Sequence, residues 1–389
     1  MKKLPTVVII KSSPWKTAHQ SRNHPEYSAI FDLLQLYESK IHFILVGTSG
    51  TPTSGTLLKN ETIAWDIKTT GRLSSFTYHL DLMKLLFRYR PHLVIVLGML
   101  NFLPVAIYSL LSWKSRYVPV FIGEFGYHGT KKVNQFLMAL GFRLLGTSLQ
   151  LSQKKILSAF TLSRYTQGCM EKLAPNLSGK IKLISYPISP SFSSAQQNFV
   201  SKHPEEPMVL TVAGIEPRKG LDILVKAVSL LPKRFKVIVK GSIRDNSYMS
   251  KLTAMVKNLN IEDRVTFITD IIDYDALTSY YKSATLFVFP TRDDCLGVVI
   301  LEALHCGLPV IATSVGGVPD MIENGVNGIL VKADNPRELA NAISLLLNDD
   351  ALRRKLAANA RPVLTNRYYK GRITLKEALM QSISELDRR

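Results

Sequence analysis

The chain has 389 residues, of which 46% are hydrophobic and 20% charged. This profile fits two globular domains and excludes a mainly disordered or fibrous protein. The three cysteines are too few to staple a chain of this length, and no pair has the spacing of zinc ligands. We therefore expect a reducing compartment and no structural metal.

Basic residues concentrate in the first half of the chain. Residues 1–195 hold 23 Lys and Arg against 8 Asp and Glu, a difference of +15, whereas residues 196–389 hold 26 and 22, a difference of +4. A half of the chain with this excess of positive charge is expected to bind a polyanion, which could be an anionic membrane surface, a phosphorylated substrate or nucleic acid. The alternative is a merely solvated basic surface. Nucleic acid is rejected, because no basic stretch is interleaved with aromatic residues.

Two apolar stretches in this half bear on export and membrane insertion. The first, Met1–Lys11, is interrupted by Pro5 and lacks a cleavage-like site, so it is a poor export signal. The second, Leu93–Ser112, is long enough to span a bilayer, but it contains glycine, asparagine and proline. We expect a buried strand followed by an apolar helix there rather than a membrane span.

Strand and helix patterns alternate along both halves. In the first half we expect strands at Thr6–Ile10, His42–Val46, Leu93–Leu97, Val118–Ile122 and Lys182–Ser185, and helices at Tyr27–Tyr37, Phe76–Tyr89 and Lys132–Leu145. In the second half we expect strands at Met208–Ala213, Lys236–Lys240, Val265–Ile268, Leu286–Phe289, Val310–Thr313 and Gly328–Val331, and helices at Leu221–Leu230, Ser247–Asn258, Tyr274–Lys282, Val298–His305, Val318–Ile322 and Pro336–Leu347.

This alternation predicts parallel sheets covered by helices on both faces. The boundary lies near Ser189–Pro207, where polar residues and prolines lack apolar periodicity. The predicted fold class is α/β, with two doubly wound domains facing each other across a cleft. Ligands of such sheets bind outside the carboxyl ends of the strands.

The most informative stretch follows the strand that ends at Phe289. Asp294 stands just before a predicted helix that begins near Gly297, and Glu302 lies inside that helix. The free amides at the helix N-terminus, at Gly297 and Val298, form a phosphate site. Asp294 is otherwise a plain N-cap. Glu302 lies in an apolar segment, where a carboxylate accepts hydroxyl hydrogen bonds or pairs with a surface lysine.

The run from Asp294 to Val310 is Asp-Cys-Leu-Gly-Val-Val-Ile-Leu-Glu-Ala-Leu-His-Cys-Gly-Leu-Pro-Val. It resembles the signature of the family 4 glycosyltransferases, retaining enzymes of the GT-B fold that use nucleotide-sugar donors. That signature has two acidic residues with seven residues between them, and Asp294 replaces the usual glutamate. The resemblance implies that Asp294 contacts the donor sugar hydroxyls and that Glu302 holds the ribose. Metal binding at Asp293 and Asp294 is the alternative, and the resemblance disfavours it.

A second match is Val212-Ala-Gly-Ile-Glu-Pro-Arg-Lys-Gly220, which looks like the loop whose arginine and lysine neutralise the donor diphosphate in this family. Lys219 falls on the lysine position, but the arginine position falls on Gly214. Arg218 is the nearby candidate to replace that arginine. Without a metal, side-chain cations and helix amides must stabilise the leaving diphosphate. A plain basic loop is the alternative.

The first half matches the family only in outline. Its first loop, Lys11-Ser-Ser-Pro-Trp-Lys16, lacks the glycines usual there. By resemblance, His128 is the candidate for a histidine near the donor sugar and phosphate, with Glu124 as a weaker candidate and an ordinary loop histidine as the alternative. Ser163 ends a strand-to-helix step that resembles one in the family, or it is a helix N-cap.

The resemblance implies residues 1–195 as an acceptor-binding Rossmann-like domain, residues 196–365 as a nucleotide-sugar-binding Rossmann-like domain, and residues 366–389 as a helix that crosses back to the first. It further implies a hexosyltransferase that takes a UDP- or GDP-linked sugar, needs no cofactor or metal, and uses a lipid-linked or cell-envelope glycan acceptor in polysaccharide biosynthesis. The base would bind near 240–242 and 270–272. The alternative is a non-catalytic GT-B binding module recruited to an anionic membrane or glycan.

The segment Lys131–Leu145 combines basic residues with a wide apolar face. A helix of this kind docks on an anionic membrane, or it is a core helix with a basic outer face. Together with the charge asymmetry it predicts a cytoplasmic protein, peripheral at the inner face of the membrane.

Overall fold

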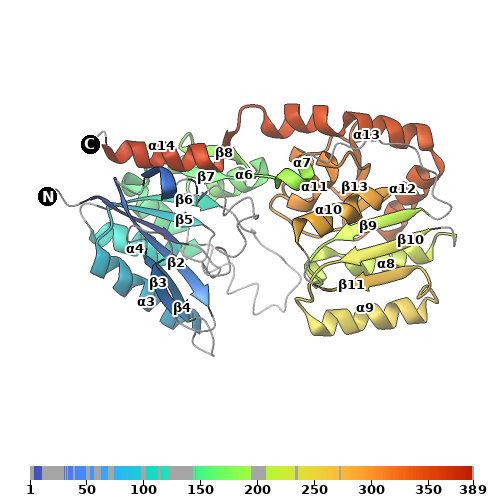
Figure 1. The fold of residues 1–389 in the computed structure, drawn as a ribbon, viewed down its shortest axis with the longest axis horizontal. Coiled ribbons are helices and arrows are strands. Elements are labelled where there is room, and N and C mark those ends of the chain that lie inside the picture. The colour runs from blue at the N-terminus through green and yellow to red at the C-terminus, as the bar shows by residue number, and fades with distance from the viewer. Residues whose placement is uncertain are drawn as a thin grey trace. The chain divides into compact units, whose positions relative to one another are not determined.

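The computed structural model describes residues 4–10, parts of 30–37, 40–49, 53–56, 63–68, 74–97, 102–112, 115–121, 143–144, 146–193, 207–232, 235–270 and 273–387. These residues form two compact units. Unit 1 is drawn from Met1–Phe125, Lys131–Pro187 and Gly371–Arg389, and unit 2 is centred on Ile188–Lys370. Each unit carries its own sheet and helices (Figure 1).

The elements of unit 1 are the strands β1 (Thr6–Ile10), β2 (His42–Ser49), β3 (Thr53–Thr56), β4 (Ile63–Lys68), β5 (Leu93–Leu97), β6 (Arg116–Phe121), β7 (Ala159–Thr161), β8 (Ile181–Ser185) and β15 (Ile373–Thr374), and the helices α3 (Ser74–Tyr89), α4 (Phe102–Leu111), α6 (Arg164–Leu173) and α14 (Leu375–Asp387). The strand order is β15-β8-β7-β6-β5-β1-β2-β4-β3. Among the described strands, only β3 pairs antiparallel, at one edge.

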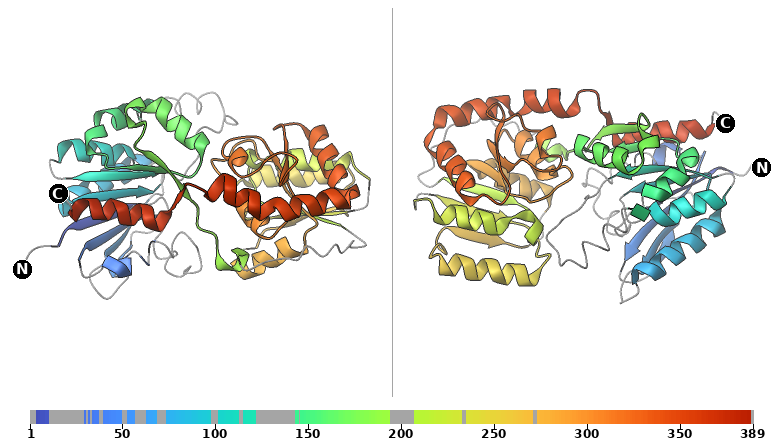
Figure 2. Two further views of the ribbon diagram at one scale, coloured as in Figure 1. Left: turned by 90° about the horizontal axis from the view of Figure 1, so that it is seen from above. Right: turned by 180° about the vertical axis from the view of Figure 1, so that it is seen from behind.

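The sheet of unit 1 is doubly wound around β1, which pairs with β2 on one side and β5 on the other. Every residue of β1 and β5 is buried, because these runs of branched aliphatic residues are covered on both faces. At the far edge β15 pairs with β8, and α14 packs beside it. Figure 2 shows this last helix, in red, against the sheet of unit 1.

The elements of unit 2 are the strands β9 (Met208–Val212), β10 (Lys236–Lys240), β11 (Val265–Ile268), β12 (Leu286–Phe289), β13 (Val310–Thr313) and β14 (Gly328–Val331), and the helices α7 (Pro190–Ser193), α8 (Leu221–Ser229), α9 (Asn246–Asn258), α10 (Tyr274–Ser283), α11 (Val298–His305), α12 (Pro336–Asn348) and α13 (Asp350–Leu364), followed by a π-helical turn at Thr365–Tyr369. The order β11-β10-β9-β12-β13-β14 is parallel throughout. This is the Rossmann order, with its switch point between β9 and β12.

Helices cover the sheet of unit 2 in two groups. Helix α8 contacts α9 and α12, whereas α7 contacts α10 and α11, and α11 contacts α13. Side-chain caps fix several helix starts: Asp245 accepts from the Tyr248 amide, Asp273 from the Ala276 amide and Asp349 from the Leu352 amide. Each cap satisfies one of the amides that a helix N-terminus leaves without a partner.

The predicted doubly wound α/β fold is confirmed, and the described strands match the expected ones within a few residues. Within the stretch Leu93–Ser112, the described residues form β5 and α4, as predicted. Among the described residues no helix is both long and apolar enough to cross a bilayer. The expected helices Tyr27–Tyr37 and Lys132–Leu145 lie wholly or partly outside the described residues.

Two predictions need correction. The expected helix at Val318–Ile322 is only a 3-10 turn at Val318–Asp320, because Gly316 and Gly317 precede it and Pro319 follows at its second position. The strands β3, β4 and β15 were not predicted, and β7 was implied only by the strand-to-helix step that ends at Ser163. Strands β3 and β15 have only four and two residues, and Thr53–Thr56 contains a glycine and no large apolar side chain, so no alternating pattern marks it. Strand β4, with six residues, was missed although it is as long as the predicted strands.

Candidate functional site

The candidate site lies in unit 2, where the chain leaves the carboxyl ends of β9 and β12. These strands are neighbours and pair at Val209–Leu286 and Leu210–Phe287. The loop after β9 contains a 3-10 turn at Pro217–Lys219, and the loop after β12 leads into α11. Because the strand order reverses between these two strands, the loops diverge there and leave room for a ligand.

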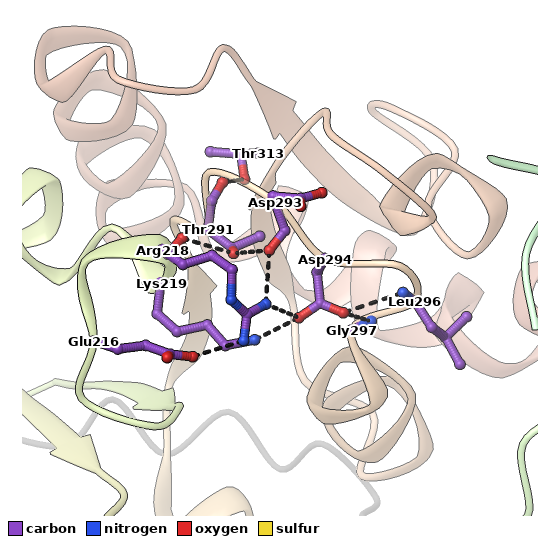
Figure 3. A network of polar contacts seen from close by, with 9 residues as sticks. All are labelled: Glu216, Arg218, Lys219, Thr291, Asp293, Asp294, Leu296, Gly297 and Thr313. Carbon is purple, nitrogen blue, oxygen red and sulfur yellow. Dashed lines mark hydrogen bonds and ion pairs between the residues drawn. The ribbon is translucent and has the colours of Figure 1, made fainter. Parts of the chain in front are cut away.

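Asp294 lies between the cations of one loop and the amides of the other (Figure 3). Its Oδ2 is 2.6 Å from Nζ of Lys219 and 3.9 Å from a guanidinium nitrogen of Arg218. Its Oδ1 accepts hydrogen bonds from the amides of Leu296 (3.1 Å) and Gly297 (2.7 Å). Burial alone would raise the pKa of Asp294, but Lys219, the Leu296 amide and Arg218 outweigh it and hold the pKa below its ordinary value. The carboxylate is therefore ionised at neutral pH.

Asp294 is not the N-cap of α11. The residue before the first helical residue, Val298, is Gly297, whose φ of 79° is left-handed. The amides that Asp294 accepts from belong to the turn before the helix. Thus the Gly297 amide, which the sequence predicted to face a phosphate, is donated to Asp294 here, while Val298 begins the helix.

Arg218 and Lys219 point to the same side of the loop after β9 and are both largely buried (Figure 3). Arg218 forms an ion pair with Glu216 (2.6 Å) and donates to the carbonyl of Asp293 (3.0 Å). The ammonium of Lys219 also lies 5.5 Å from the ring centroid of Phe289, at the end of β12. The two side chains thus hold both loops together while presenting positive charge at the sheet edge.

A partly buried ion pair holds these loops to the rest of unit 2. The guanidinium of Arg292 makes two hydrogen bonds to Asp222 on α8, at 2.8 and 2.9 Å. The hydroxyl of Tyr248 donates to the same carboxylate (2.6 Å), and the amide of Arg292 donates to the carbonyl of Arg218 (2.8 Å). Two parallel bonds of this kind fix orientation as well as distance. The sequence did not predict this pair, since nothing in the spacing links residues 70 positions apart.

Two glycines permit the close approach of backbone around Asp294. A Cβ on Gly316, whose φ is +52°, would lie 1.8 Å from the carbonyl oxygen of Asp294, and the amide of Gly317 donates to that oxygen (3.0 Å). A Cβ on Gly220, whose φ is +66°, would lie 2.0 Å from the carbonyl oxygen of Pro290. Both positions therefore require glycine for backbone conformation and for space.

Glu302 occupies different surroundings, one turn into α11. Its side chain is buried, and its Oε2 accepts a hydrogen bond from the hydroxyl of Tyr281 on α10 (2.6 Å). Burial raises the pKa of Glu302 to about 7, although the hydrogen bond from Tyr281 opposes this shift. The sequence predicted that a hydroxyl would satisfy this carboxylate, and Tyr281, which supplies it here, was not predicted. Tyr281 itself is packed between Phe192 and Phe287.

The remaining predicted residues do not join this group within the described structure. His128, Glu124 and the loop at 11–16 lie outside the described residues. Ser163 is the N-cap of α6 and accepts from the amide of Thr166 (3.1 Å). In the predicted base-binding region, buried Lys240 pairs with Asp270 at 2.6 Å. In the part of the chain that the structure describes, no three His, Cys, Asp or Glu side chains gather as metal ligands would.

The second half of the chain is similar to a known protein family and to curated proteins. Residues 193–363 match the family model described as glycosyl transferases group 1. The D-inositol 3-phosphate glycosyltransferase of Xylanimonas cellulosilytica is 32% identical over 158 residues, which are 40% of this chain and 38% of that protein. The alpha-D-kanosaminyltransferase of Streptomyces kanamyceticus is 32% identical over 164 residues, 42% of each chain. The chain thus spans about two fifths of the length of the curated relatives it matches.

Solved structures resemble the chain over almost its whole length. HepE from Anabaena, in complex with UDP and glucose, aligns with a TM-score of 0.70 at 18% identity and covers 97% of this chain and 98% of that one. WaaG, a glycosyltransferase involved in lipopolysaccharide biosynthesis, aligns with a TM-score of 0.69 at 17% identity, covering 96% and 98%. The fold is GT-B, with two Rossmann-like units.

Proposed function

We propose that this chain is a retaining glycosyltransferase, which moves a hexose from a UDP- or GDP-linked donor to a lipid-linked or cell-envelope glycan. The observation that carries the proposal is the position of Asp294. An ionised carboxylate stands between Lys219 and the start of α11, at the switch point of a Rossmann sheet. Cations and helix amides at such a point suit a diphosphate, and a carboxylate beside them suits sugar hydroxyls.

In the proposed reaction the bond between the sugar and the diphosphate breaks, and negative charge develops on the leaving phosphate. Lys219 and Arg218 stabilise this charge, together with the amides that begin α11. The acceptor hydroxyl attacks from the face that the phosphate leaves, and the departing phosphate takes its proton. Lys219 turns from Asp294 to the diphosphate when the donor binds, which frees Asp294 to accept hydrogen bonds from the sugar.

Glu302 binds the ribose hydroxyls of the donor in this proposal. A carboxylate with a pKa near 7 exchanges its proton readily at neutral pH, and two hydroxyl donors would stabilise the ionised form. Tyr281 already holds one oxygen of Glu302 in place, so the other remains to receive the donor. Glu302 and Asp294 thus bind different parts of the same molecule, and no metal takes part.

The first experiment is a thermal-shift screen against UDP, GDP, ADP and their sugar conjugates, with and without EDTA. A ligand that binds only the native state raises the melting temperature by mass action. We expect one nucleotide series to raise it equally with and without EDTA, and donor hydrolysis with the matching sugar conjugate. Lys219→Met should abolish both the rise in melting temperature and the hydrolysis. Lys226 lies on the exposed side of α8, so Lys226→Met should keep both.

The alternative is a GT-B shell that binds without turnover. Gly214 in place of a cation and Asp294 in place of the longer glutamate favour it. The two candidates differ in a direct measurement, because a binding module shifts the melting temperature with a nucleotide sugar but neither hydrolyses nor transfers it. A shift without turnover would therefore select the shell, and the absence of any shift would refute donor binding altogether.

We further propose that unit 1 rests on an anionic membrane, at its cytoplasmic face, through helix α4. This helix, Phe-Leu-Pro-Val-Ala-Ile-Tyr-Ser-Leu-Leu, has no charged residue. Four of its apolar side chains are exposed, in a stripe with helical spacing: Leu103 (36%), Ile107 (42%), Leu110 (44%) and Leu111 (63%). Exposed Phe87 of α3 packs edge-on against Tyr108 and widens the stripe. An apolar face of this kind is typical of interfacial helices.

Cations lie in the segments next to this stripe. Arg88 and Arg90 stand at the end of α3, Arg116 follows α4, and Lys155 donates to the carbonyl of Ser112 just beyond α4 (2.9 Å). Basic residues near an anionic surface contribute about 1 kcal/mol each. Flotation with vesicles should show binding to phosphatidylglycerol-containing membranes and not to pure phosphatidylcholine. Ile107→Glu should abolish it, whereas Leu345→Glu on α12 should not; equal binding of both variants would overturn the docking face.

A further inference from the structure

Gly214, which occupies the place of the missing cation, is covered by the side chain of Arg244. A Cβ at Gly214 would lie 3.1 Å from Cγ of Arg244, 3.7 Å from its Nε and 4.0 Å from its Cδ. Gly214 is not among the glycines with positive φ, so its backbone conformation does not require glycine. The absence of a side chain at this position instead leaves the space that Arg244 fills.

The backbone holds Arg244 in this place. The amide of Ile215 donates to the carbonyl of Ser242 (2.9 Å), and the amides of Arg244 and Asp245 both donate to the carbonyl of Ile215 (3.1 and 3.0 Å). The loops that leave β9 and β10 are therefore joined by three hydrogen bonds. Asp245 in turn caps α9 through the amide of Tyr248. Arg244 thus stands in a fixed segment, on the same sheet edge as the loop of Lys219.

Charge accounting shows why this edge needs a further cation. Lys219 pairs with Asp294, and Arg218 pairs with Glu216, so these two cations and two carboxylates sum to zero. A diphosphate meets no net positive charge there. Within the described residues, the exposed guanidinium of Arg244 makes no hydrogen bond or ion pair. Its charge is therefore not offset by an ion pair.

We propose that Arg244 is a binding residue for the diphosphate of the donor and supplies, from the loop after β10, the cation that the loop after β9 lacks. This inference rests on the proposed function. A guanidinium offers two parallel hydrogen bonds to phosphate oxygens and keeps its charge at every physiological pH. As the bond between sugar and phosphate breaks, Arg244 and Lys219 share the negative charge left on the diphosphate.

The test is Arg244→Gln, which removes the charge but keeps Cγ, the atom nearest Gly214, and an amide group that can donate hydrogen bonds. Affinities for UDP, GDP and ADP are measured by calorimetry, each beside the corresponding monophosphate. We expect the affinity for the diphosphate that binds the wild type to fall about tenfold or more, and that for the monophosphate much less. Arg337→Gln, an exposed arginine at the start of α12, is the matched control and should change neither.

A second, double variant moves the guanidinium from the loop after β10 to the loop after β9. Gly214→Arg combined with Arg244→Gly places a guanidinium on the loop after β9 and removes the side chain that fills the space, so diphosphate affinity should recover toward the wild-type value. Gly214→Ala alone should shift the Arg244 side chain by a few tenths of an ångström and lower diphosphate affinity less than Arg244→Gln does. Wild-type diphosphate affinity and turnover in Arg244→Gln would overturn the inference and leave the proposed function intact. A wild-type protein that binds none of the nucleotides would overturn both.

Discussion

The surroundings of Asp294 and of Glu302 differ sharply, although eight positions separate them and both lie at or in α11. Asp294 faces Lys219, Arg218 and two amides, which lower its pKa, whereas apolar side chains and the hydroxyl of Tyr281 surround Glu302, whose pKa rises to about 7. The first carboxylate is permanently charged at neutral pH, and the second gains or loses a proton there. The loop before α11 and the helix itself thus each carry one carboxylate, and their different surroundings suit the two groups to different roles.

The largest expected effect comes from removing the charge on the first of these carboxylates. Asp294→Asn keeps an oxygen that can accept from the amides of Leu296 and Gly297, so the loop should retain its geometry. The ion pair with Lys219 is lost. We expect donor turnover to fall about 100-fold or more, measured as release of the nucleoside diphosphate.

The same exchange at an exposed site of unit 1, Asp81→Asn, is the control and should leave turnover unchanged. Turnover of Asp294→Asn within threefold of that control would mean that the carboxylate has no part in the reaction.

The second prediction concerns the proton on Glu302. Because the folded-state pKa of about 7 lies above the ordinary value of 4.5, this group stabilises the fold fully below pH 4.5 and loses that contribution as the pH rises through 7. The free energy of unfolding should therefore fall by roughly 3 kcal/mol between pH 5 and pH 8, relative to Glu302→Gln. Urea unfolding at several pH values measures the difference between the two proteins.

Donor affinity should change in the opposite direction. Ribose hydroxyls bind the ionised carboxylate, so the affinity for the nucleotide sugar should rise about tenfold from pH 6 to pH 8. Each phosphate of a nucleotide sugar carries one ester and one anhydride linkage, so neither titrates in this range. A pH-independent affinity in the wild type would rule out Glu302 as the ribose ligand.

The third prediction separates two effects of replacing a glycine: steric overlap with the backbone of Asp294, and strain from a positive φ. Gly316 and Gly325 both have positive φ, at +52° and +77°, but only at Gly316 would a Cβ meet another atom within 4 Å, the backbone of Asp294. Gly325→Ala should cost about 1 kcal/mol of stability, and Gly316→Ala about 2 kcal/mol more, because of the added overlap.

Denaturant unfolding gives both values, and donor affinity should fall only in Gly316→Ala. Equal costs for the two alanines would show that the loop around Asp294 can move without penalty.

The smallest effect is expected for Tyr281→Phe. The hydrogen bond from Tyr281 lowers the pKa of Glu302, so its loss should move the pH midpoint of donor binding upward and cost about 1 kcal/mol of stability. Tyr280→Phe, on the neighbouring position of α10, is the matched control. An unchanged or lower midpoint would mean that Tyr281 does not set the charge state of Glu302.

The sequence predicted those parts of the fold that depend on local pattern. Apolar runs such as Thr6–Ile10 and Val310–Thr313 are buried strands, and the spacing of Asp294 and Glu302 placed both correctly relative to α11. The short edge strand Thr53–Thr56 was not predicted, because it carries no large apolar residue.

Contacts between loops could not be predicted from the sequence. The pair of Asp222 and Arg292, the hydroxyl of Tyr281 on Glu302 and the cover of Gly214 by Arg244 all depend on which strand ends lie side by side. The missing arginine at position 214 is visible in the sequence. Its replacement from another loop becomes visible only when β9 and β10 are seen to be neighbours.

The pairing of β15 with β8 has a consequence for the order of folding. Residues 371–387 complete the far edge of a sheet whose other described strands all precede residue 186, and unit 2 is in effect an insertion in unit 1. During synthesis the whole of unit 2 emerges from the ribosome while β8 still has an open edge. Unit 2 can therefore fold first, and unit 1 closes only when α14 buries Leu375, Leu379 and Ile383.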